Sequence, residues 1–101
     1  MIREQLPANK RGELLAIETQ DHYLKVYTDK GHHLILMRLK DALTLLNDYP
    51  GLQIHRSWWV ANSAITTIEK ADRKTWLVLK NGIKAPVSRT FTADVKKLGW
   101  V

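Results

Sequence analysis

Two arginines and one histidine lie at predicted junctions between strands and loops, where their side chains could bind the edges of nucleic-acid bases. Arg56 separates two short apolar segments, Arg89 precedes the last amphipathic segment, and His22 follows a predicted turn. An arginine can donate two parallel hydrogen bonds to guanine, and loops expose the side chains that they carry. Each residue taken alone is more often an ordinary surface or salt-bridged side chain, and the sequence does not show that the three loops converge.

Two serines adjoin these arginines, and their hydroxyl groups could hold phosphate oxygens. Ser57 follows Arg56 and Ser88 precedes Arg89. Contacts with phosphates fix the register of a protein on nucleic acid, whereas contacts with base edges carry the sequence information. The same loops therefore contain candidates for both kinds of contact.

The charge of the chain is asymmetric along the sequence. The formal net charge is +6 and the isoelectric point is about 9.8. Residues 1–51 carry seven basic and seven acidic side chains, whereas residues 52–101 carry nine basic and three acidic ones. A solvated basic face is common in small proteins, but an excess confined to one half favours a surface that binds a polyanion. The lysines of that half that we expect to hold phosphates are Lys80, Lys84, Lys96 and Lys97.

The sequence contains no pattern typical of an enzyme, a metal site or a nucleotide-binding site. It has no cysteine, and no two of its histidines (His22, His32, His33 and His55) have the i, i+4 spacing of zinc ligands on a helix. His55 and Ser57 could suggest nucleophilic catalysis, but Ser57 does not lie in a G-x-S-x-G turn. Glycine-rich phosphate loops are absent as well. We therefore expect no catalysis, no cofactor and no bound metal.

Composition favours one globular domain. The chain has 101 residues, of which 45% are hydrophobic and 26% are charged, and these proportions are typical of a folded domain. No apolar segment approaches the roughly 20 residues of a membrane span, and residues 1–7 do not resemble a signal peptide, so we expect a cytoplasmic location. Residues 1–12 are predicted to be a linker or N-terminal arm, which would connect the domain to an upstream region of a longer protein.

Hydrophobic periodicity predicts a mainly β fold with two helices. Residues 39–49 place leucines at i, i+4 and i+7, on one face of an amphipathic helix. Residues 88–98 predict a shorter C-terminal helix by the same pattern. The other apolar segments alternate or are rich in β-branched and aromatic residues, which favours strands. The predicted strands are 14–19, 23–28, 32–37, 52–55, 58–61, 64–69, 75–79 and 83–87.

Local detail can be predicted at three places. Residues 32–37 are apolar on both faces, which is typical of a central strand. Asn81-Gly82 joins two apolar segments, which predicts a hairpin with a type I′ turn. Trp58 and Trp59 are neighbours in a strand, so we expect one ring in the core and the other half-exposed.

Three segments carry a distinctive combination of residues: 17–28 (IETQDHYLKVYT), 54–62 (IHRSWWVAN) and 79–89 (LKNGIKAPVSR). Together they resemble the LytTR DNA-binding domain of bacterial transcription regulators. The resemblance covers residues 13–98, and I-H-R-S-x-x-V-x-N followed by N-G-x-x-x-P-V-S-R is far more specific than either segment alone. Residues 13–101 are therefore interpreted as a LytTR-like DNA-binding domain.

The resemblance implies a fold, a partner and a set of contact residues. It implies small antiparallel sheets stacked together, a short helix, and loops that enter successive major grooves of double-stranded DNA. Two copies often bind direct repeats, which implies a homodimer on DNA. By position, the base-reading residues would be His22, Arg56 and Arg89, and Asn62 would be structural. With the phosphate candidates, the predicted DNA-binding residues are His22, Arg56, Ser57, Lys84, Ser88 and Arg89.

The tryptophan pair departs from the usual aromatic–aliphatic pair and resembles a proteobacterial subgroup of the family. Members of that subgroup often carry transmembrane segments upstream in place of a phosphorylation receiver. The resemblance therefore implies sequence-specific DNA binding as the output of a transcription regulator similar to response regulators. It also implies an upstream membrane or sensory region, so that the full-length protein could be anchored in the membrane.

Two other functions remain open from the sequence. A β module that binds single-stranded nucleic acid would use exposed aromatic rings. A module for protein interaction, or for binding a membrane surface, would use the basic face without DNA. Competition between duplex and single strands, and the salt dependence of binding, would separate these functions from sequence-specific binding of duplex DNA.

Overall fold

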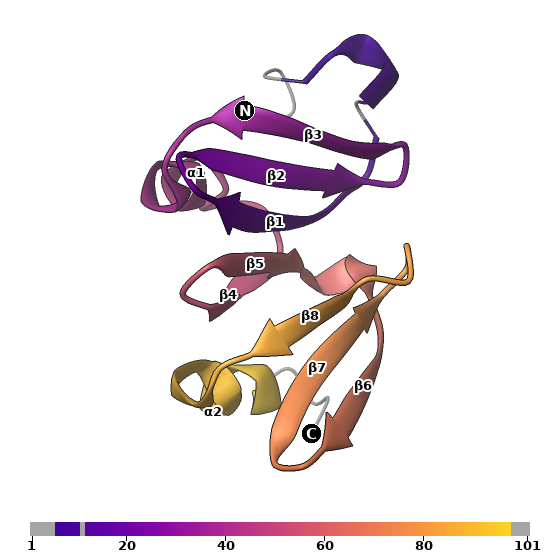
Figure 1. Cartoon of the computed structure of the whole chain (residues 1–101), viewed down its shortest axis with the longest axis vertical. Helices are drawn as coiled ribbons and strands as arrows, with labels where there is room; N and C mark the ends of the chain where they lie inside the picture. The colour runs from indigo at the N-terminus through magenta and orange to yellow at the C-terminus, as the bar shows by residue number, and fades with distance from the viewer. Residues whose placement is uncertain (1–5, 11, 98–101) are drawn as a thin grey trace.

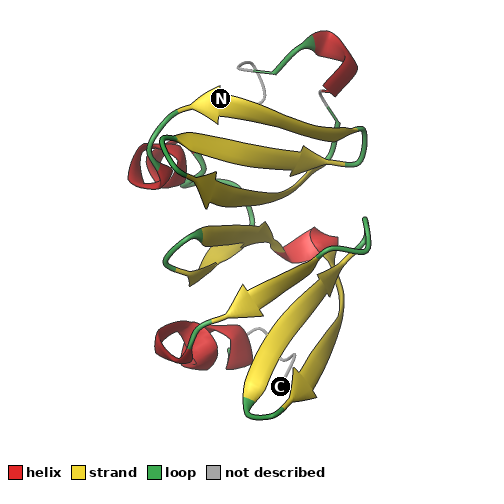
Figure 2. Ribbon diagram, viewed as in Figure 1, coloured by secondary structure: helices red, strands yellow, loops and turns green. Residues whose placement is uncertain are grey.

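The computed structural model describes residues 6–10 and 12–97, which form a mainly β fold with two short α-helices (Figures 1 and 2). This confirms the predicted fold class. In chain order the elements are η2 (Ala8–Lys10), β1 (Leu14–Gln20), β2 (Tyr23–Thr28), β3 (Gly31–Leu36), α1 (Leu39–Leu45), β4 (Gly51–His55), β5 (Trp58–Ala61), η3 (Asn62–Ala64), β6 (Ile65–Ala71), β7 (Lys74–Leu79), β8 (Lys84–Val87), η4 (Arg89–Phe91) and α2 (Thr92–Lys96).

The strands form two antiparallel sheets. The first has the order β3-β2-β1-β5-β4 and the second has the order β6-β7-β8. The second sheet lies beside the β4–β5 end of the first, so the two follow one another along the longest axis of the molecule (Figure 1). The molecule is elongated, with extents of 38, 25 and 23 Å along its three principal axes.

Strand β3 lies at the edge of the first sheet, so its prediction as a central strand was wrong. Only one of its large apolar side chains, that of Ile35, is buried, whereas Leu34 is 47% exposed and Leu36 is 75% exposed. An apolar run on both faces is typical of a central strand only when both faces are covered. Here the face that carries Leu34 and Leu36 is open to solvent.

Helix α1 begins where it was predicted but ends at Leu45 rather than at residue 49. Its buried side is formed by Ala42, with Leu46 just beyond its end. After the helix, the backbone N–H groups of Asn47 and Tyr49 donate to the carbonyl oxygens of residues three positions earlier, at 3.3 and 2.9 Å. Such tighter turns replace the last helical turn, because the residue before Pro50 is disfavoured in the α conformation.

The hairpin between β7 and β8 has a longer loop than predicted. The N–H of Gly82 donates to the carbonyl oxygen of Leu79 (2.8 Å), and Gly82 has a φ of 84° while Asn81 does not have a positive φ. A turn followed by a glycine in the left-handed region is typical of a three-residue hairpin loop. The predicted type I′ turn at Asn81-Gly82 was therefore wrong. The side chain of Asn81 instead accepts a hydrogen bond from the N–H of Ile83 (3.1 Å).

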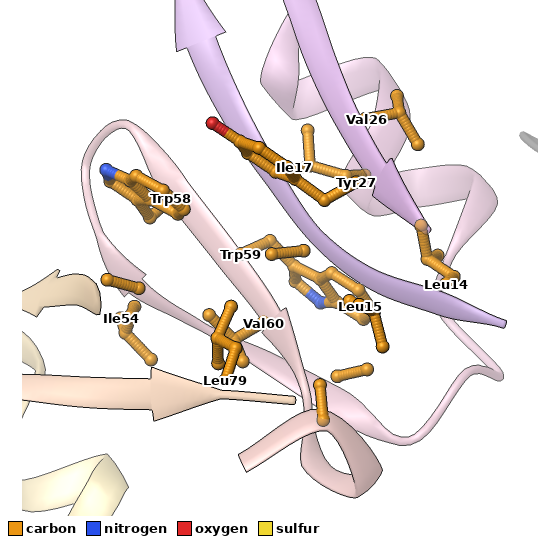
Figure 3. Close-up of a cluster of buried hydrophobic side chains, with 14 of the residues drawn as sticks. Leu14, Leu15, Ile17, Val26, Tyr27, Ile54, Trp58, Trp59, Val60 and Leu79 are labelled. Atoms are coloured by element: carbon orange, nitrogen blue, oxygen red, sulfur yellow. The ribbon is translucent and has the colours of Figure 1, made fainter. Parts of the chain in front are cut away.

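Both tryptophans are buried, with 7% of Trp58 and 3% of Trp59 exposed, so the expectation of one half-exposed ring was wrong (Figure 3). Trp58 stacks on Tyr27 with ring centroids 5.9 Å apart and an interplanar angle of 2°. The rings of Trp59 and Tyr49 form a T-shaped pair with centroids 5.8 Å apart. Strand β5 lies inside the sheet between β1 and β4, and both of its faces are covered.

The second sheet packs on the first through β4. Ile54 of β4, Leu77 of β7 and Ala85 of β8 are fully buried in the common core. The predicted C-terminal helix is divided into η4 and α2, and Val95 of α2 is also fully buried. Leu98, the last apolar residue of the predicted helix, lies outside the described residues.

Leu6, within the predicted N-terminal arm, is buried in the same core. Among the described helices, none is long and apolar enough to cross a membrane.

Candidate nucleic-acid interface

The loops that carry the predicted base-reading residues lie along one side of the molecule. His22 is in the β1–β2 loop, Arg56 is in the β4–β5 loop, and Arg89 follows the end of β8. Figure 1 shows these three places on the left of the view, one above the other along the long axis. All three side chains are exposed. The structure therefore brings together, on one edge, loops that lie far apart in the sequence.

Two backbone hydrogen bonds hold the middle loop between its neighbours. The N–H of Thr19, at the end of β1, donates to the carbonyl oxygen of Ser57 (2.8 Å). The N–H of Ser88 donates to the carbonyl oxygen of Ile54 (2.9 Å), which joins the end of β8 to β4. Backbone contacts of this kind fix the relative positions of the loops independently of their side chains.

His22 and Arg56 line one hollow on this edge. Asp21, whose φ is 53°, lines it as well and turns the chain between β1 and β2. The other lining residues come from β1, from the end of β3 and from the start of α1: Thr19, Leu36, Met37, Arg38, Leu39 and Asp41. The hollow thus combines hydrogen-bond donors and two carboxylates with an apolar wall.

Arg89 lines a second hollow further along the same side. The β6–β7 turn contributes Asp72, Arg73 and Lys74 to this hollow, and β4 contributes His55. Asp72 and Arg73 have φ values of 50° and 65°, as a two-residue type I′ turn requires. This turn presents two exposed cations beside Arg89.

The two predicted serines differ in their surroundings. Ser57 is half-buried, and its backbone N–H donates to Nδ1 of His55 (3.1 Å). The hydroxyl oxygen of Ser88 is buried and forms no hydrogen bond within the described part of the chain. In this conformation the hydroxyl of Ser88 does not face solvent, whereas its backbone holds η4 through a bond from the N–H of Phe91 (3.0 Å).

Lys84 does not lie with the other predicted contact residues. It opens β8 and precedes Ser88 by four residues, which is about 13 Å of strand at about 3.3 Å per residue. Its Nζ is 2.8 Å from a carboxylate oxygen of Glu69. Lys80 is at the β7–β8 loop, at the opposite end of β8 from Arg89, and pairs with Glu13 at 3.0 Å (Figure 1). Both lysines have carboxylate partners and lie away from the three loops.

Three cations on the loop side were missed by the sequence analysis. Arg38 lies in the hollow of His22, and Arg73 and Lys74 lie in the hollow of Arg89. None of the three forms an ion pair with another described residue. A signal did exist, because successive turns of an antiparallel sheet alternate between its two ends. The end of β3 comes two connections after the β1–β2 loop in the same sheet and so returns to the same side, which locates Arg38.

Strands β1 and β2 are joined by a polar contact on the face of the first sheet that lies near the β7–β8 loop. The hydroxyl of Tyr27 donates to the carboxylate of Glu18 (2.9 Å), and the Nζ of Lys25 lies 5.2 Å from the centre of the Tyr27 ring. Burial, the hydrogen bond to Glu18 and the charge of that carboxylate raise the pKa of Tyr27 above its ordinary value. The described residues include no group of three or more acidic or histidine side chains arranged to hold a metal ion.

Known proteins resemble this chain in sequence and in fold. It is 30% identical over 87 residues to the "Sensory transduction protein LytT" of Bacillus subtilis (strain 168), a match that covers 85% of this chain and 36% of that protein. The chain thus spans about a third of the length of this relative.

The fold is similar to the solved LytTr DNA-binding domain of a putative methyl-accepting/DNA response regulator from Bacillus cereus. The TM-score is 0.76 and the sequence identity is 22%, over 88% of this chain and 83% of that one. The sequence pattern described as "LytTr DNA-binding domain" matches residues 10–100. The chain therefore belongs to the LytTr DNA-binding domain family.

Proposed function

We propose that this chain recognises a specific sequence in double-stranded DNA and acts as the output domain of a bacterial transcription regulator. The observation that carries the proposal is the gathering of His22, Arg56 and Arg89, all exposed, on one side of the molecule. The mechanism is binding through loops held by a rigid double sheet, and no step of catalysis is involved.

The length of the molecule supports contact with more than one groove. The whole molecule extends 38 Å along the axis on which the three loops follow one another, and successive major grooves on one face of B-DNA are about 34 Å apart. In the proposed complex the outer loops bring His22 and Arg89 to successive major grooves. The middle loop then brings Arg56 to the base pairs between them.

The chemistry of each side chain suits a base edge. The guanidinium group of Arg89 can donate two hydrogen bonds to guanine in the major groove, whereas that of Arg56 faces the minor groove between the outer contacts and can donate to the base acceptors there. His22 can donate one hydrogen bond, and Leu36 in the same hollow offers an apolar contact for a thymine methyl group. Such contacts discriminate between bases because the wrong base leaves a donor unpaired.

Phosphate contacts are assigned to cations that form no ion pair with a carboxylate in the described part of the chain. Arg38, Arg73, Lys74 and Lys96 are exposed and flank the three reading loops or the β6–β7 turn. Each cation that neutralises a phosphate releases condensed counterions, so affinity must fall steeply as salt rises. Ser57 contributes a further hydrogen bond to a phosphate from the middle loop.

In the cell, we place this domain in the cytoplasm, with two copies on direct repeats of its site. Its relative LytT is named a sensory transduction protein, and the match covers only part of that protein. We therefore assign the domain to a regulator whose sensory or membrane region lies outside the present sequence. Contact between the two copies forms on the DNA.

The proposal is tested by selecting duplexes from a random-sequence library with this chain. The enriched duplex and a random duplex are then titrated by fluorescence anisotropy at about 50 mM and about 200 mM salt. We expect at least about 1,000-fold preference for the enriched duplex and a steep loss of affinity at the higher salt. Tighter binding to either separated strand than to the duplex, or binding to anionic vesicles but not to DNA, would contradict the proposal.

A further inference from the structure

The loop that carries Arg56 has neither of the two turn types that two-residue hairpin loops favour. His55 pairs with Trp58, so Arg56 and Ser57 alone form the connection between β4 and β5. Two-residue hairpin loops favour turns with a positive φ at the first or at both central residues, because these turns match the twist of the strands. Among the described residues other than glycine, positive φ occurs at Asp21, Asp72 and Arg73, and hence at neither residue of this loop.

A side chain supplies the contact that stabilises this conformation. Nδ1 of His55 accepts a hydrogen bond from the backbone N–H of Ser57, at 3.1 Å across two residues. Asparagine and aspartate side chains hold turns in the same way, by accepting from the backbone two residues further on. The pairing register shifts between Gln53 and His55, which shows a bulge just before the loop, and bulges re-aim the residues that follow them.

The contact also defines the protonation state of the imidazole. A nitrogen that accepts from an N–H carries no proton, so His55 must be the neutral tautomer with its proton on Nε2. A proton added to Nδ1 would place two donors face to face and end the contact with Ser57. The charge of one side chain is thus coupled to the conformation of the loop that presents Arg56.

We propose that His55 is a positioning residue for DNA recognition, in which the neutral imidazole holds the Arg56–Ser57 loop and its protonation releases the loop. The inference rests on the proposed function, since it concerns how Arg56 is presented to the bases. It assigns no DNA contact to His55 itself. Specific binding should therefore weaken as the pH falls through the range in which histidines gain charge.

The elements packed against His55 carry charged groups of both signs. Arg56 belongs to its own loop, and Arg89 lies in the same hollow. The β6–β7 turn contributes one acid and two cations to this hollow, α2 carries exposed charges of both signs, and the lysine of β8 is paired with a carboxylate. These groups are Asp72, Arg73 and Lys74, then Asp94 and Lys96, and finally Lys84 with Glu69.

A different role for His55 would give the opposite pH dependence. If the imidazole bound a phosphate as a cation, a lower pH would strengthen binding and only a cationic replacement would restore it. If the ring only filled space, removal of its acceptor without loss of volume would have little effect. Variants that keep or remove a hydrogen-bond acceptor at the position of Nδ1 distinguish the positioning role from both alternatives.

The experiment compares the wild-type chain with the His55→Asn, His55→Gln and His55→Ala variants on the enriched duplex and on a random duplex. Asparagine places an amide oxygen near the position of Nδ1, whereas the oxygen of glutamine lies one bond further from the backbone. We expect His55→Asn to bind the enriched duplex within about twofold of wild type, and His55→Gln and His55→Ala to bind about 2- to 10-fold more weakly. Binding to the random duplex should be unchanged in all three.

The pH dependence of binding is a second measurement, and it would be the same in wild type and His55→Asn if His55 only supported the fold. Wild type and His55→Asn share His22, His32 and His33, so the ratio of their affinities isolates His55. Between about pH 8 and about pH 5.5, this ratio should change about 2- to 10-fold in favour of the variant. A constant ratio, a ratio that changes in favour of wild type, or His55→Asn binding as weakly as His55→Ala would overturn the inference.

A measurement without DNA separates failure of this inference from failure of the proposed function. The nitrogen chemical shifts of His55 at pH 8 report its tautomer, and the exchange rate of the Ser57 amide reports its hydrogen bond. We expect an unprotonated Nδ1 and a protected Ser57 amide in wild type and in His55→Asn, with protection lost in His55→Gln. A proton on Nδ1 at pH 8 would overturn the inference even if the duplex is recognised. If no duplex is preferred, the proposed function fails and the role of His55 in recognition fails with it.

Discussion

The backbone N–H of Ser88 donates to the carbonyl oxygen of Ile54 over 2.9 Å, and this bond sets the distance between the loops that carry Arg56 and Arg89. Ile54 is fully buried and lies two residues before Arg56, while Ser88 directly precedes Arg89. Each exposed arginine therefore lies within two residues of the hydrogen bond that joins the two sheets. A rigid spacing of this kind is what recognition of fixed base positions requires.

Removal of either arginine should reduce specificity rather than general affinity. For Arg56→Ala and Arg89→Ala, we expect losses of about 1–3 kcal/mol on the enriched duplex and little change on a random duplex. The measurement is the dissociation constant for both duplexes at one salt concentration. Lys84→Ala is the matched control, because Lys84 pairs with Glu69 away from the loops. Equal losses on both duplexes would mean that the arginines bind phosphates.

Cations of the β6–β7 turn should act on every sequence alike. Arg73→Ala and Lys74→Ala should each weaken binding to specific and random duplexes by a similar factor. Each should also reduce the slope of log affinity against log salt by about 1. Lys80→Ala serves as the control, since its Nζ is 3.0 Å from Glu13 and it lies at the opposite end of β8. A salt slope that is lowered as much by Lys80→Ala as by Arg73→Ala would refute the assignment.

Stability should depend on the core between the two sheets and not on the open edge of the first sheet. Leu77 is fully buried, so Leu77→Ala should cost about 2–5 kcal/mol of unfolding free energy. Leu36 is 75% exposed, and Leu36→Ala should change the unfolding free energy by less than about 0.5 kcal/mol. Urea unfolding followed by tryptophan fluorescence gives both values. A larger loss at Leu36 than at Leu77 is incompatible with the packing described above.

The raised pKa of Tyr27 predicts a loss of stability at alkaline pH. Burial and the bond to Glu18 favour the neutral phenol in the folded state. An unfolded tyrosine loses its proton near pH ~10, so the stabilisation is complete below that pH and declines as the pH rises above it. The unfolding free energy of wild type should therefore fall between about pH 9 and pH 11 more steeply than that of Tyr27→Phe. Parallel profiles for the two proteins would show that Tyr27 does not contribute to this loss.

The strand pattern and the loop positions could be predicted from the sequence because they depend on local signals. Alternation and turn residues place His22, Arg56 and Arg89 at loops, and the antiparallel connections then carry these loops to one side. The edge position of β3 could not be predicted in this way. Leu34 and Leu36 read as core residues, and only the strand order determines whether a face is covered.

The position of each cation in the fold could not be predicted from the sequence for the same reason. Charge counting found the excess in residues 52–101 but not the side on which each cation lies. Lys80 and Lys84 have carboxylate partners from distant parts of the chain, whereas Arg73 and Lys74 have none among the residues that the structure describes. Ion pairs between residues as far apart as Glu13 and Lys80 depend on the tertiary fold, so a count along the sequence does not reveal them.

The central claim is that side chains from separate loops read one duplex together, and methylation interference tests it most directly. Methylation of guanine N7 blocks hydrogen bonds in the major groove. On the enriched duplex, we predict two groups of interfering guanines about 10 base pairs apart. Arg89→Ala should abolish one group and His22→Ala the other. A single group, or two groups that neither substitution changes, would contradict the account.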